Sequence, residues 1–152
     1  KISDKMFRCY AMLSDGEWNE GSIWEAALLA PTLKLHNLTV IIDFNKWQAT
    51  GRSEEIMSLQ PLYLKWEAFG WHVQEINGHN FNEMEEAFNN ARQIKNKPSV
   101  IVANTIKGKG VSFMEDDNNW HYRIPNSEEL KLALEELGSA LWETLSLKKW
   151  NQ

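Results

Sequence analysis

Four short apolar stretches of the chain have the hydrophobic pattern of β-strands. We expect these strands at Phe7–Leu13, Leu38–Phe44, Trp71–Ile76 and Ser99–Thr105. The second and fourth, which read LTVIIDF and SVIVANT, are nearly continuous apolar runs rich in Val and Ile. Such runs are typical of strands buried on both faces of a parallel sheet, because strands that face water on one side alternate polar and apolar residues.

Segments with helical periodicity separate these strands. Apolar residues recur at helical spacing in Ser22–Leu35, Leu62–Phe69, Asn82–Ile94 and Glu128–Leu137. Pro31 predicts a kink or break in the first helix. Asn80 or Asn82 is the expected cap of the third, and Ser127 or Asn126 that of the fourth. Because strands alternate with helices, we predict right-handed βαβ units and an α/β fold, an open, mainly parallel sheet with flanking helices.

Composition limits what this chain does. Its 152 residues, 43% of them hydrophobic, suit one domain, which we place at residues 1–145 with residues 146–152 as a tail. A formal net charge of −5 argues against a nucleic-acid binder that needs a basic face, and the apolar runs are too short to cross a membrane. The single cysteine, Cys9, excludes an internal disulfide framework and favours a cytoplasmic setting. The eight tryptophans need a large core or a partner surface to cover them.

Polar loops follow three of the expected strands, at Asp15–Gly21, Asn45–Glu55 and Lys107–Pro125. Ligands of open parallel sheets bind outside the carboxyl ends of the strands, where all three loops would lie. Asp15 and Asn45 are separated by one crossover unit of 30 residues and would stand at neighbouring strand ends. A carboxylate and an amide oxygen form a partial cage that suits Mg²⁺ when diphosphate oxygens complete it, although Asp-Gly alone is also common in turns.

The residues around these two positions resemble the thiamine-diphosphate motif of the transketolase family, which opens with Gly-Asp-Gly and closes with Asn. The stretch reads SDGEWNEGSIWEAALLAPTLKLHNLTVIIDFNKWQATG, and the similarity continues in EAFGWHVQEINGHN, KPSVIVANTIKGKGVSFME and WHYRIP. It covers roughly Arg8 to Leu137 and most resembles small, split transketolases whose amino-terminal half is a separate polypeptide. Two positions depart from the pattern, since Ser14 replaces the first motif glycine and Tyr122 stands where larger transketolases have Gly.

This resemblance implies a set of site residues. Asp15 and Asn45 match the two side-chain ligands of Mg²⁺ (or Ca²⁺ or Mn²⁺), and the backbone carbonyl of Trp47 matches the third protein ligand. Gly16 matches the residue whose amide contacts the diphosphate of thiamine diphosphate. His121 matches a histidine that touches both the diphosphate and the substrate.

Two glutamates also match family positions. Glu20 corresponds to an acidic residue near the dimer interface that links two cofactor sites through a buried network, and it is the second candidate catalytic residue beside His121. Glu25 matches a glutamate with a structural role. Glu20 and His121 each have a simpler interpretation. Glu20 is also a charge that the helix dipole favours. His121 lies between Trp120 and Tyr122, in a segment that has the pattern of a packed turn.

The activity implied by the resemblance is that of a transketolase, a transferase that moves a two-carbon ketol unit from a ketose to an aldehyde. Only fourteen residues precede Asp15, and the chain begins with Lys1 rather than Met. Family elements upstream of the motif, and the pyrimidine-binding domain, are not in this sequence. We therefore expect a domain incomplete at its N-terminus that acts with a C-terminal, pyrimidine-binding subunit in a hetero-oligomer or dimer and is inactive alone.

Two other functions stay open. One is a truncated, non-catalytic assembly subunit that binds no cofactor. The other is a different thiamine-diphosphate enzyme, such as deoxyxylulose-phosphate synthase or a 2-oxo acid dehydrogenase component, although NKWQATG and WHYRIP favour the transketolase branch. The substrate is expected to be a sugar or sugar phosphate whose identity this sequence does not specify, because the contacts that select it lie mostly in other segments.

Overall fold

The computed structural model describes residues 7–138 and divides the chain into two compact units. The first unit extends to Thr105 and the second begins at Ile106, and each is described by itself. The single domain expected over residues 1–145 stays a prediction. The expected tail at residues 146–152 lies outside the described residues.

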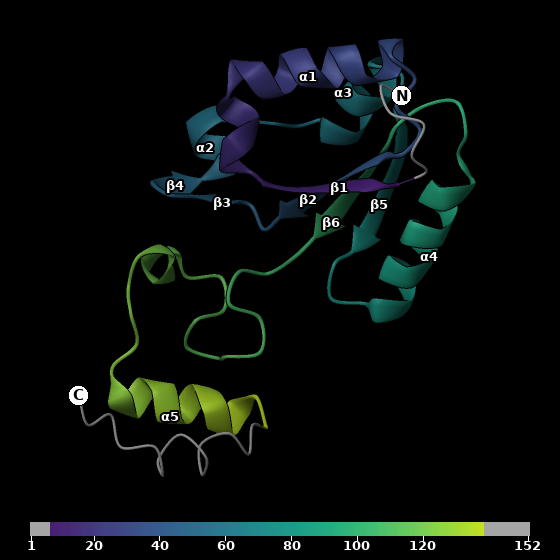
Figure 1. The fold of residues 1–152 in the computed structure, drawn as a ribbon. Coiled ribbons are helices and arrows are strands. Elements are labelled where there is room, and N and C mark those ends of the chain that lie inside the picture. Colours follow the sequence, from purple (N-terminus) through teal and green to yellow (C-terminus); the bar gives the residue numbers. More distant parts are fainter. Residues whose placement is uncertain (1–6, 139–152) are drawn as a thin grey trace, which may run out of the picture. The chain divides into compact units, whose positions relative to one another are not determined.

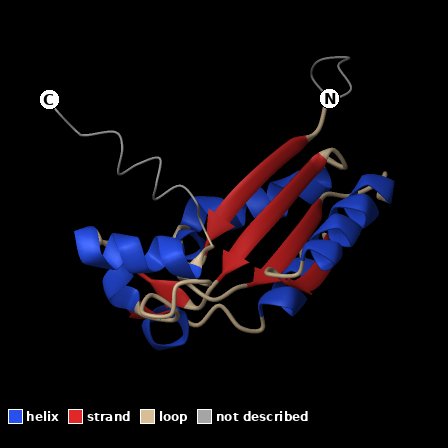
Figure 2. Cartoon of the chain, turned by 90° about the horizontal axis from the view of Figure 1, so that it is seen from below, coloured by secondary structure: helices blue, strands red, loops and turns tan. Residues whose placement is uncertain are grey.

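A four-stranded parallel sheet forms the centre of the first unit (Figure 1). Its strands are β1 (Cys9–Ser14), β2 (Leu38–Phe44), β5 (His72–Asn77) and β6 (Ser99–Asn104), in the order β1-β2-β6-β5. Figure 2 shows these strands running in the same direction. The α/β class and the parallel sheet expected from the sequence are therefore confirmed, and β2 has the bounds that its apolar run predicted.

Helices cover both faces of this sheet. Helices α1 (Gly21–Thr32) and α3 (Leu62–Ala68) lie on one face, and α4 (Phe81–Gln93) lies on the other (Figure 1). The main core fills the space beneath α1 and α3, and its buried members are Trp18, Ala27, Ala30, Val40, Ile42, Phe44, Leu59, Leu62, Trp66, Trp71, Val100 and Val102. None of the helices among residues 7–138 is long and apolar enough to cross a membrane.

Four tryptophans form a continuous series of edge-to-face contacts in or beside this core. The ring centroids of Trp18 and Trp66 are 4.5 Å apart, those of Trp66 and Trp71 are 4.7 Å apart, and those of Trp18 and Trp24 are 5.3 Å apart. The indole N–H of Trp71 donates to the carbonyl oxygen of Ala27 at 2.8 Å. The core of this unit, rather than a partner surface, therefore covers half of the eight tryptophans.

Helix α1 ends three residues earlier than its periodicity predicts, at Thr32 instead of Leu35. Pro31 lies in the last turn and does not break the helix before it. Lys34 adopts a left-handed conformation with φ of 51°, its N–H donates to the carbonyl of Pro31 at 2.8 Å, and the N–H of Leu35 donates to Ala30 at 3.1 Å. These two bonds are a Schellman ending, which turns the chain toward β2.

Short elements occupy the segments that lack periodicity. They are the 3-10 helix η1 (Gly16–Asn19), the strands β3 (Trp47–Gln48) and β4 (Gly51–Arg52), which pair antiparallel, and helix α2 (Ser53–Met57). Runs of two to five residues are too short to show a helical or strand period, so the sequence pattern predicts loops at these positions.

The second unit consists of a glycine-containing loop, the 3-10 helix η2 (Asn118–His121) and helix α5 (Ser127–Glu136). Asn126 caps α5 in a capping box with Glu129, so Asn126 rather than Ser127 is the cap. The hydroxyl of Ser112 donates to Oε1 of Glu136 at 2.7 Å and ties the loop to α5.

Candidate functional site

Asp15 is a completely buried carboxylate at the carboxyl end of β1. Its Oδ1 accepts a hydrogen bond from the backbone N–H of Asn45 at 3.2 Å. Its Oδ2 accepts from the N–H of Lys46 at 2.8 Å and from the hydroxyl of Ser53 at 2.9 Å. Asp15 therefore gathers the loop after β2 and the start of α2 around one side chain.

The charge of Asp15 has no counter-charge in the part of the chain that the structure describes. Burial raises the pKa of this carboxyl above its usual value, and the hydrogen bonds from Ser53, Lys46 and Asn45 oppose that rise. No Lys, Arg or His among residues 7–138 forms an ion pair with Asp15. Because a buried carboxylate is costly unless it is paired, hydrogen-bonded or bound to a metal, this site suits a cation.

Asn45 adds an amide oxygen next to Asp15. Its Oδ1 accepts the backbone N–H of Trp47 at 2.9 Å and forms an Asx turn, in which Lys46 has a φ of 70°. The N–H of the same Asn45 is bonded to Asp15, so both side chains are held at adjoining strand ends. An amide oxygen has two lone pairs and a carboxylate about four, so both keep free acceptor sites.

The chemistry of these donors fits a hard divalent cation. No group of three or more His, Cys, Asp or Glu that would suit a metal by itself occurs within the described residues. A carboxylate oxygen, an amide oxygen and a backbone carbonyl are instead the oxygen donors that Mg²⁺, Mn²⁺ and Ca²⁺ prefer. Asp15 and Asn45 offer two such oxygens at adjoining strand ends, and the Trp47 carbonyl expected as the third ligand stays a prediction.

Gly16 opens η1 directly after Asp15, where the backbone is accessible. A Cβ built on Gly16 or Gly21 meets no atom within 4 Å, so a ligand can approach the backbone at both positions. Glu20 is exposed and stands at the N-cap position of α1, and its carbonyl accepts the N–H of Ile23 at 3.1 Å. This position agrees with a dipole-favoured charge, and the inter-site network expected for Glu20 stays a prediction. Glu25 is exposed on α1.

His121 lies in η2 of the second unit and is exposed. Its ring lies 4.5 Å from that of Tyr122, while the indole N–H of Trp120 donates to the carbonyl of Phe113 at 2.9 Å. Trp120 therefore holds the turn, and His121 is left accessible to a ligand. Since the two units are described separately, the approach of His121 to Asp15 stays a prediction.

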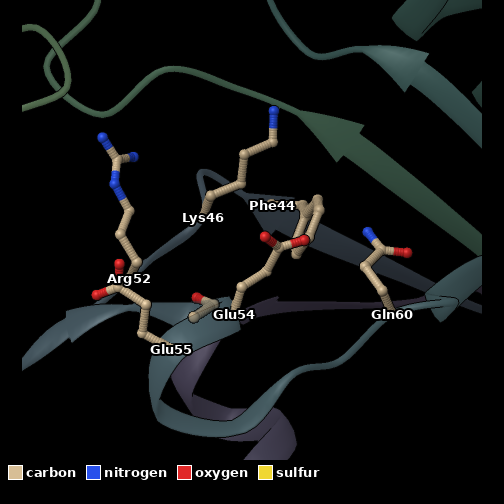
Figure 3. Close-up of a pocket in the computed structure, with 7 residues that line it drawn as sticks. Phe44, Lys46, Arg52, Glu54, Glu55 and Gln60 are labelled. Atoms are coloured by element: carbon tan, nitrogen blue, oxygen red, sulfur yellow. The ribbon is translucent and has the colours of Figure 1, made fainter.

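A cavity of about 370 Å³ adjoins the residues that hold Asp15. Its walls are formed by Phe44, Lys46, Arg52, Ser53, Glu54, Glu55 and Gln60 (Figure 3). Both basic and acidic side chains extend from these walls, so the cavity presents donors and acceptors together. Lys46 and Ser53 contact Asp15 as well, and the guanidinium of Arg52 stacks 3.7 Å above the ring of Trp47.

Two contacts of the site had no signal in the sequence analysis. Ser53 is almost completely buried and donates a hydrogen bond to Asp15, 38 positions earlier in the chain. Its sequence context, a serine followed by two glutamates, indicates only the start of a helix. The amide Nδ2 of Asn19 donates to Oε1 of Gln48 at 2.7 Å and joins η1 to β3. Both contacts connect the loop after β1 to the segment after β2.

Comparisons with known proteins show which family this chain resembles. Residues 1–148 match the family described as "Transketolase, thiamine diphosphate binding domain". The chain is 38% identical to an apulose-4-phosphate transketolase subunit of Phocaeicola vulgatus over 93% of this chain and 50% of that one. It is 47% identical to a 6-deoxy-6-sulfo-D-fructose transketolase subunit of a Clostridium species over 84% of this chain and 46% of that one.

A solved structure of a transketolase also has this fold. Transketolase of Campylobacter jejuni superimposes with a TM-score of 0.83 at 30% sequence identity, covering 88% of this chain and 21% of that one. The chain thus spans about half the length of the two subunits above and a smaller part of this transketolase. With a family match along nearly all its length, and a parallel sheet that superimposes on a known transketolase, this chain belongs to the transketolase family and represents its thiamine-diphosphate-binding domain.

Proposed function

We propose that this chain supplies the Mg²⁺- and diphosphate-binding part of a transketolase that transfers a two-carbon ketol unit from a ketose to an aldehyde. The observation that carries the proposal is the buried carboxylate of Asp15, which has no counter-charge among residues 7–138 and is bonded to Asn45 at the adjoining strand end. Family membership makes thiamine diphosphate the ligand whose metal-bound diphosphate this site takes.

Each candidate site residue of the first unit has a defined task in this proposal. The side chains of Asp15 and Asn45 and the carbonyl of Trp47 would hold the metal ion, and the backbone of Gly16 would contact the diphosphate. When it is bound, thiamine diphosphate supplies the chemistry that breaks and forms the carbon–carbon bond. Ser53 and the N–H groups of residues 45 and 46 hold the Asp15 carboxylate in one position, which would fix it as a ligand.

His121 and Glu20 complete the proposed machinery. His121 is exposed on a turn fixed by Trp120, so its imidazole is accessible to bind a diphosphate oxygen or a substrate hydroxyl. Glu20 stands exposed at the start of α1, and in the assembled enzyme it would contact a partner chain near a second cofactor site. Both roles need groups from outside the first unit.

The names of the relatives, which are subunits of transketolases, and the surface of this chain support a partner chain. Leu28, Leu29 and Leu33 are exposed by 54%, 55% and 48% at α1. Apolar side chains gathered in this way normally mark an interface. We propose that a subunit with the pyrimidine-binding domain covers α1, that the assembly works in the cytoplasm, and that the substrate is a sugar or sugar phosphate.

Cofactor titration with and without the pyrimidine-domain subunit tests this function. The mixture of both chains should bind thiamine diphosphate only when Mg²⁺, Mn²⁺ or Ca²⁺ is present and should transfer a ketol unit between sugars, whereas this chain alone should be inactive. If the two chains assemble but bind no cofactor, the proposal is wrong and the chain is a non-catalytic assembly subunit. If the mixture instead condenses pyruvate with an aldehyde phosphate, the function is that of a deoxyxylulose-phosphate synthase.

A further inference from the structure

The cavity beside Asp15 has walls that the proposed metal site does not use. Its volume of about 370 Å³ lies in the range that is usual for small-molecule pockets. Phe44 at the end of β2 and Ser53 at the start of α2 form part of the walls, and they are only 4% and 2% exposed. Because these two residues are fixed in the packed part of the first unit, the cavity is already formed in the folded chain.

The cavity shares two residues with the surroundings of Asp15. The backbone N–H of Lys46 and the hydroxyl of Ser53 donate to Oδ2 of Asp15 at 2.8 and 2.9 Å. Both residues also line the cavity. A ligand in the cavity would therefore lie against the same residues that hold the proposed metal ligand.

Charged side chains of both signs line the cavity. Lys46 and Arg52 are basic, and Glu54 and Glu55 are acidic, so the formal charge of the walls is two positive against two negative. Within residues 7–138, Lys46 forms an ion pair with neither glutamate. Its ammonium group and these carboxylates line one cavity without neutralising each other, so a molecule between them can bind to both.

This mixture of charges limits the class of ligand. A phosphate group would meet the negative charges of Glu54 and Glu55. A divalent cation would meet the positive charges of Lys46 and Arg52. An apolar molecule would remove the charged groups from water without pairing them, which is costly. A neutral molecule that both donates and accepts hydrogen bonds avoids all three costs.

The remaining walls suit such a molecule. Oε1 of Gln60 accepts the backbone N–H of Leu62 at 3.0 Å, which fixes the amide and leaves its nitrogen as a double donor. Phe44 adds an apolar surface, and Figure 3 shows the side chains of Lys46, Glu54 and Gln60 around its ring. Donors, an acceptor and an apolar surface in one cavity match the hydroxyl and C–H groups of a sugar.

We propose that this cavity binds the neutral, hydroxylated carbon chain of a sugar. Its hydroxyl groups would accept hydrogen bonds from Lys46 and Gln60 and donate one to Glu54, and its C–H groups would lie against Phe44. The assignment deepens the proposed function and rests on it, because it makes the cavity the subsite for the unphosphorylated part of the sugar substrate.

Titration of the isotopically labelled whole chain with D-fructose, followed by amide resonances in nuclear magnetic resonance spectra, tests this inference. The buffer contains no divalent cation and no thiamine diphosphate, so the result does not depend on the metal site. Saturable shifts are expected at residues 44–60. Glu54→Ala and Lys46→Met should each weaken the binding about tenfold, the effect of one lost hydrogen bond to a charged group. The matched controls Glu85→Ala and Lys131→Met remove exposed charges from α4 and α5 and should bind D-fructose unchanged.

Phosphate-containing probes test the class of ligand. Fructose 6-phosphate should bind no more tightly than D-fructose, and inorganic phosphate should leave the resonances of residues 44–60 unshifted. The inference is overturned if inorganic phosphate shifts these resonances while D-fructose does not, or if fructose 6-phosphate binds much more tightly than D-fructose. It is also overturned if Glu54→Ala and Lys46→Met bind D-fructose like their controls.

Cofactor titration of the mixture with the pyrimidine-domain subunit separates this inference from the proposed function. If D-fructose does not bind although the mixture binds thiamine diphosphate with Mg²⁺, the cavity assignment alone is wrong. If D-fructose binds in the cavity but the mixture takes no cofactor, the proposed function is wrong and the cavity is a sugar site without a substrate role.

Discussion

The backbone N–H of Asn45 donates a hydrogen bond to Oδ1 of Asp15 at 3.2 Å, although the two residues are 30 positions apart. This bond joins the two ends of the motif directly, after the chain has passed through α1 and β2. Because β1 and β2 are neighbouring parallel strands, the ends of both strands are fixed by the sheet itself. The bond therefore ties the start of the loop after β2 to Asp15 before any ligand is bound.

Removing the Asp15 carboxylate should affect both stability and ligand binding. Asp15→Ala leaves the Ser53 hydroxyl and the N–H groups of Asn45 and Lys46 without their acceptor, so we expect the free energy of unfolding to fall by about 2 kcal/mol. In the complete enzyme, Mg²⁺-dependent affinity for thiamine diphosphate should be lost. Urea unfolding measures the first effect and cofactor titration the second.

A matched control for this substitution is Glu86→Ala, which removes an exposed carboxylate from α4. It should change neither the unfolding midpoint nor cofactor affinity. Unaltered, metal-dependent cofactor binding in Asp15→Ala would show that Asp15 is not a metal ligand, whatever happens to stability.

Ser53 should contribute through its single bond to Asp15. Ser53→Ala removes the hydroxyl that donates to Oδ2 at 2.9 Å, and we expect a loss of about 1 kcal/mol in the free energy of unfolding. Ser58→Ala, at an exposed serine just after α2, is the control and should change little. Denaturant midpoints of the two variants give the comparison, and equal midpoints would contradict a role of Ser53 in holding the carboxylate.

The sequence pattern predicts the central elements well because they depend on local periodicity. The run of Val and Ile in β2 fixes that strand at Leu38–Phe44, and Asp15 and Asn45 lie at neighbouring strand ends as the spacing indicates. The end of α1 depends instead on Lys34, a residue whose left-handed backbone no periodicity reveals. The contact of Ser53 with Asp15 spans 38 residues and arises only when the sheet and α2 are assembled.

The same limit applies to the rest of the site. The family resemblance places His121 beside the cofactor, but its position is decided by how the second unit packs, which local pattern does not encode. The hydrogen bond from Arg8 to the carbonyl oxygen of Arg92 is likewise not visible in the sequence pattern, since the two residues are 84 positions apart. Long-range polar contacts are therefore the part of this molecule that periodicity and spacing leave out.

His72 should make stability depend on pH. Burial, with a smaller effect of Lys97, lowers the pKa of His72 below 6.5, and its Nε2 is buried without a partner among the described residues. Between the lowered pKa and 6.5 the unfolded chain binds more protons than the folded one, so the free energy of unfolding rises with pH. The destabilisation that His72 causes is absent above pH 6.5, appears as the pH falls through 6.5, and levels off below the lowered pKa of His72.

The variant His72→Gln removes this titrating group and should flatten the corresponding part of the curve. Urea unfolding of wild type and variant at several pH values between 4 and 8 gives the difference, which cancels the contributions of other groups (steps of about half a unit suffice). If the two curves run parallel across this range, the assignment to His72 is wrong.

Gly108 should be much less tolerant of alanine than Gly138, although both are glycines with positive φ, of 72° and 62°. A Cβ at Gly108 would lie 2.5 Å from the carbonyl oxygen of Met114, whereas one at Gly138 would meet nothing within 4 Å. Gly138→Ala therefore measures the cost of the left-handed backbone alone, about 1 kcal/mol. Gly108→Ala adds a clash with backbone that a side-chain rotation cannot relieve, so we expect a further loss of about 2 kcal/mol or more in the stability of the second unit. Hydrogen exchange of the α5 amides reports that stability separately from the sheet, and equal protection in the two variants would show that the 108–114 loop moves freely enough to accept the extra carbon.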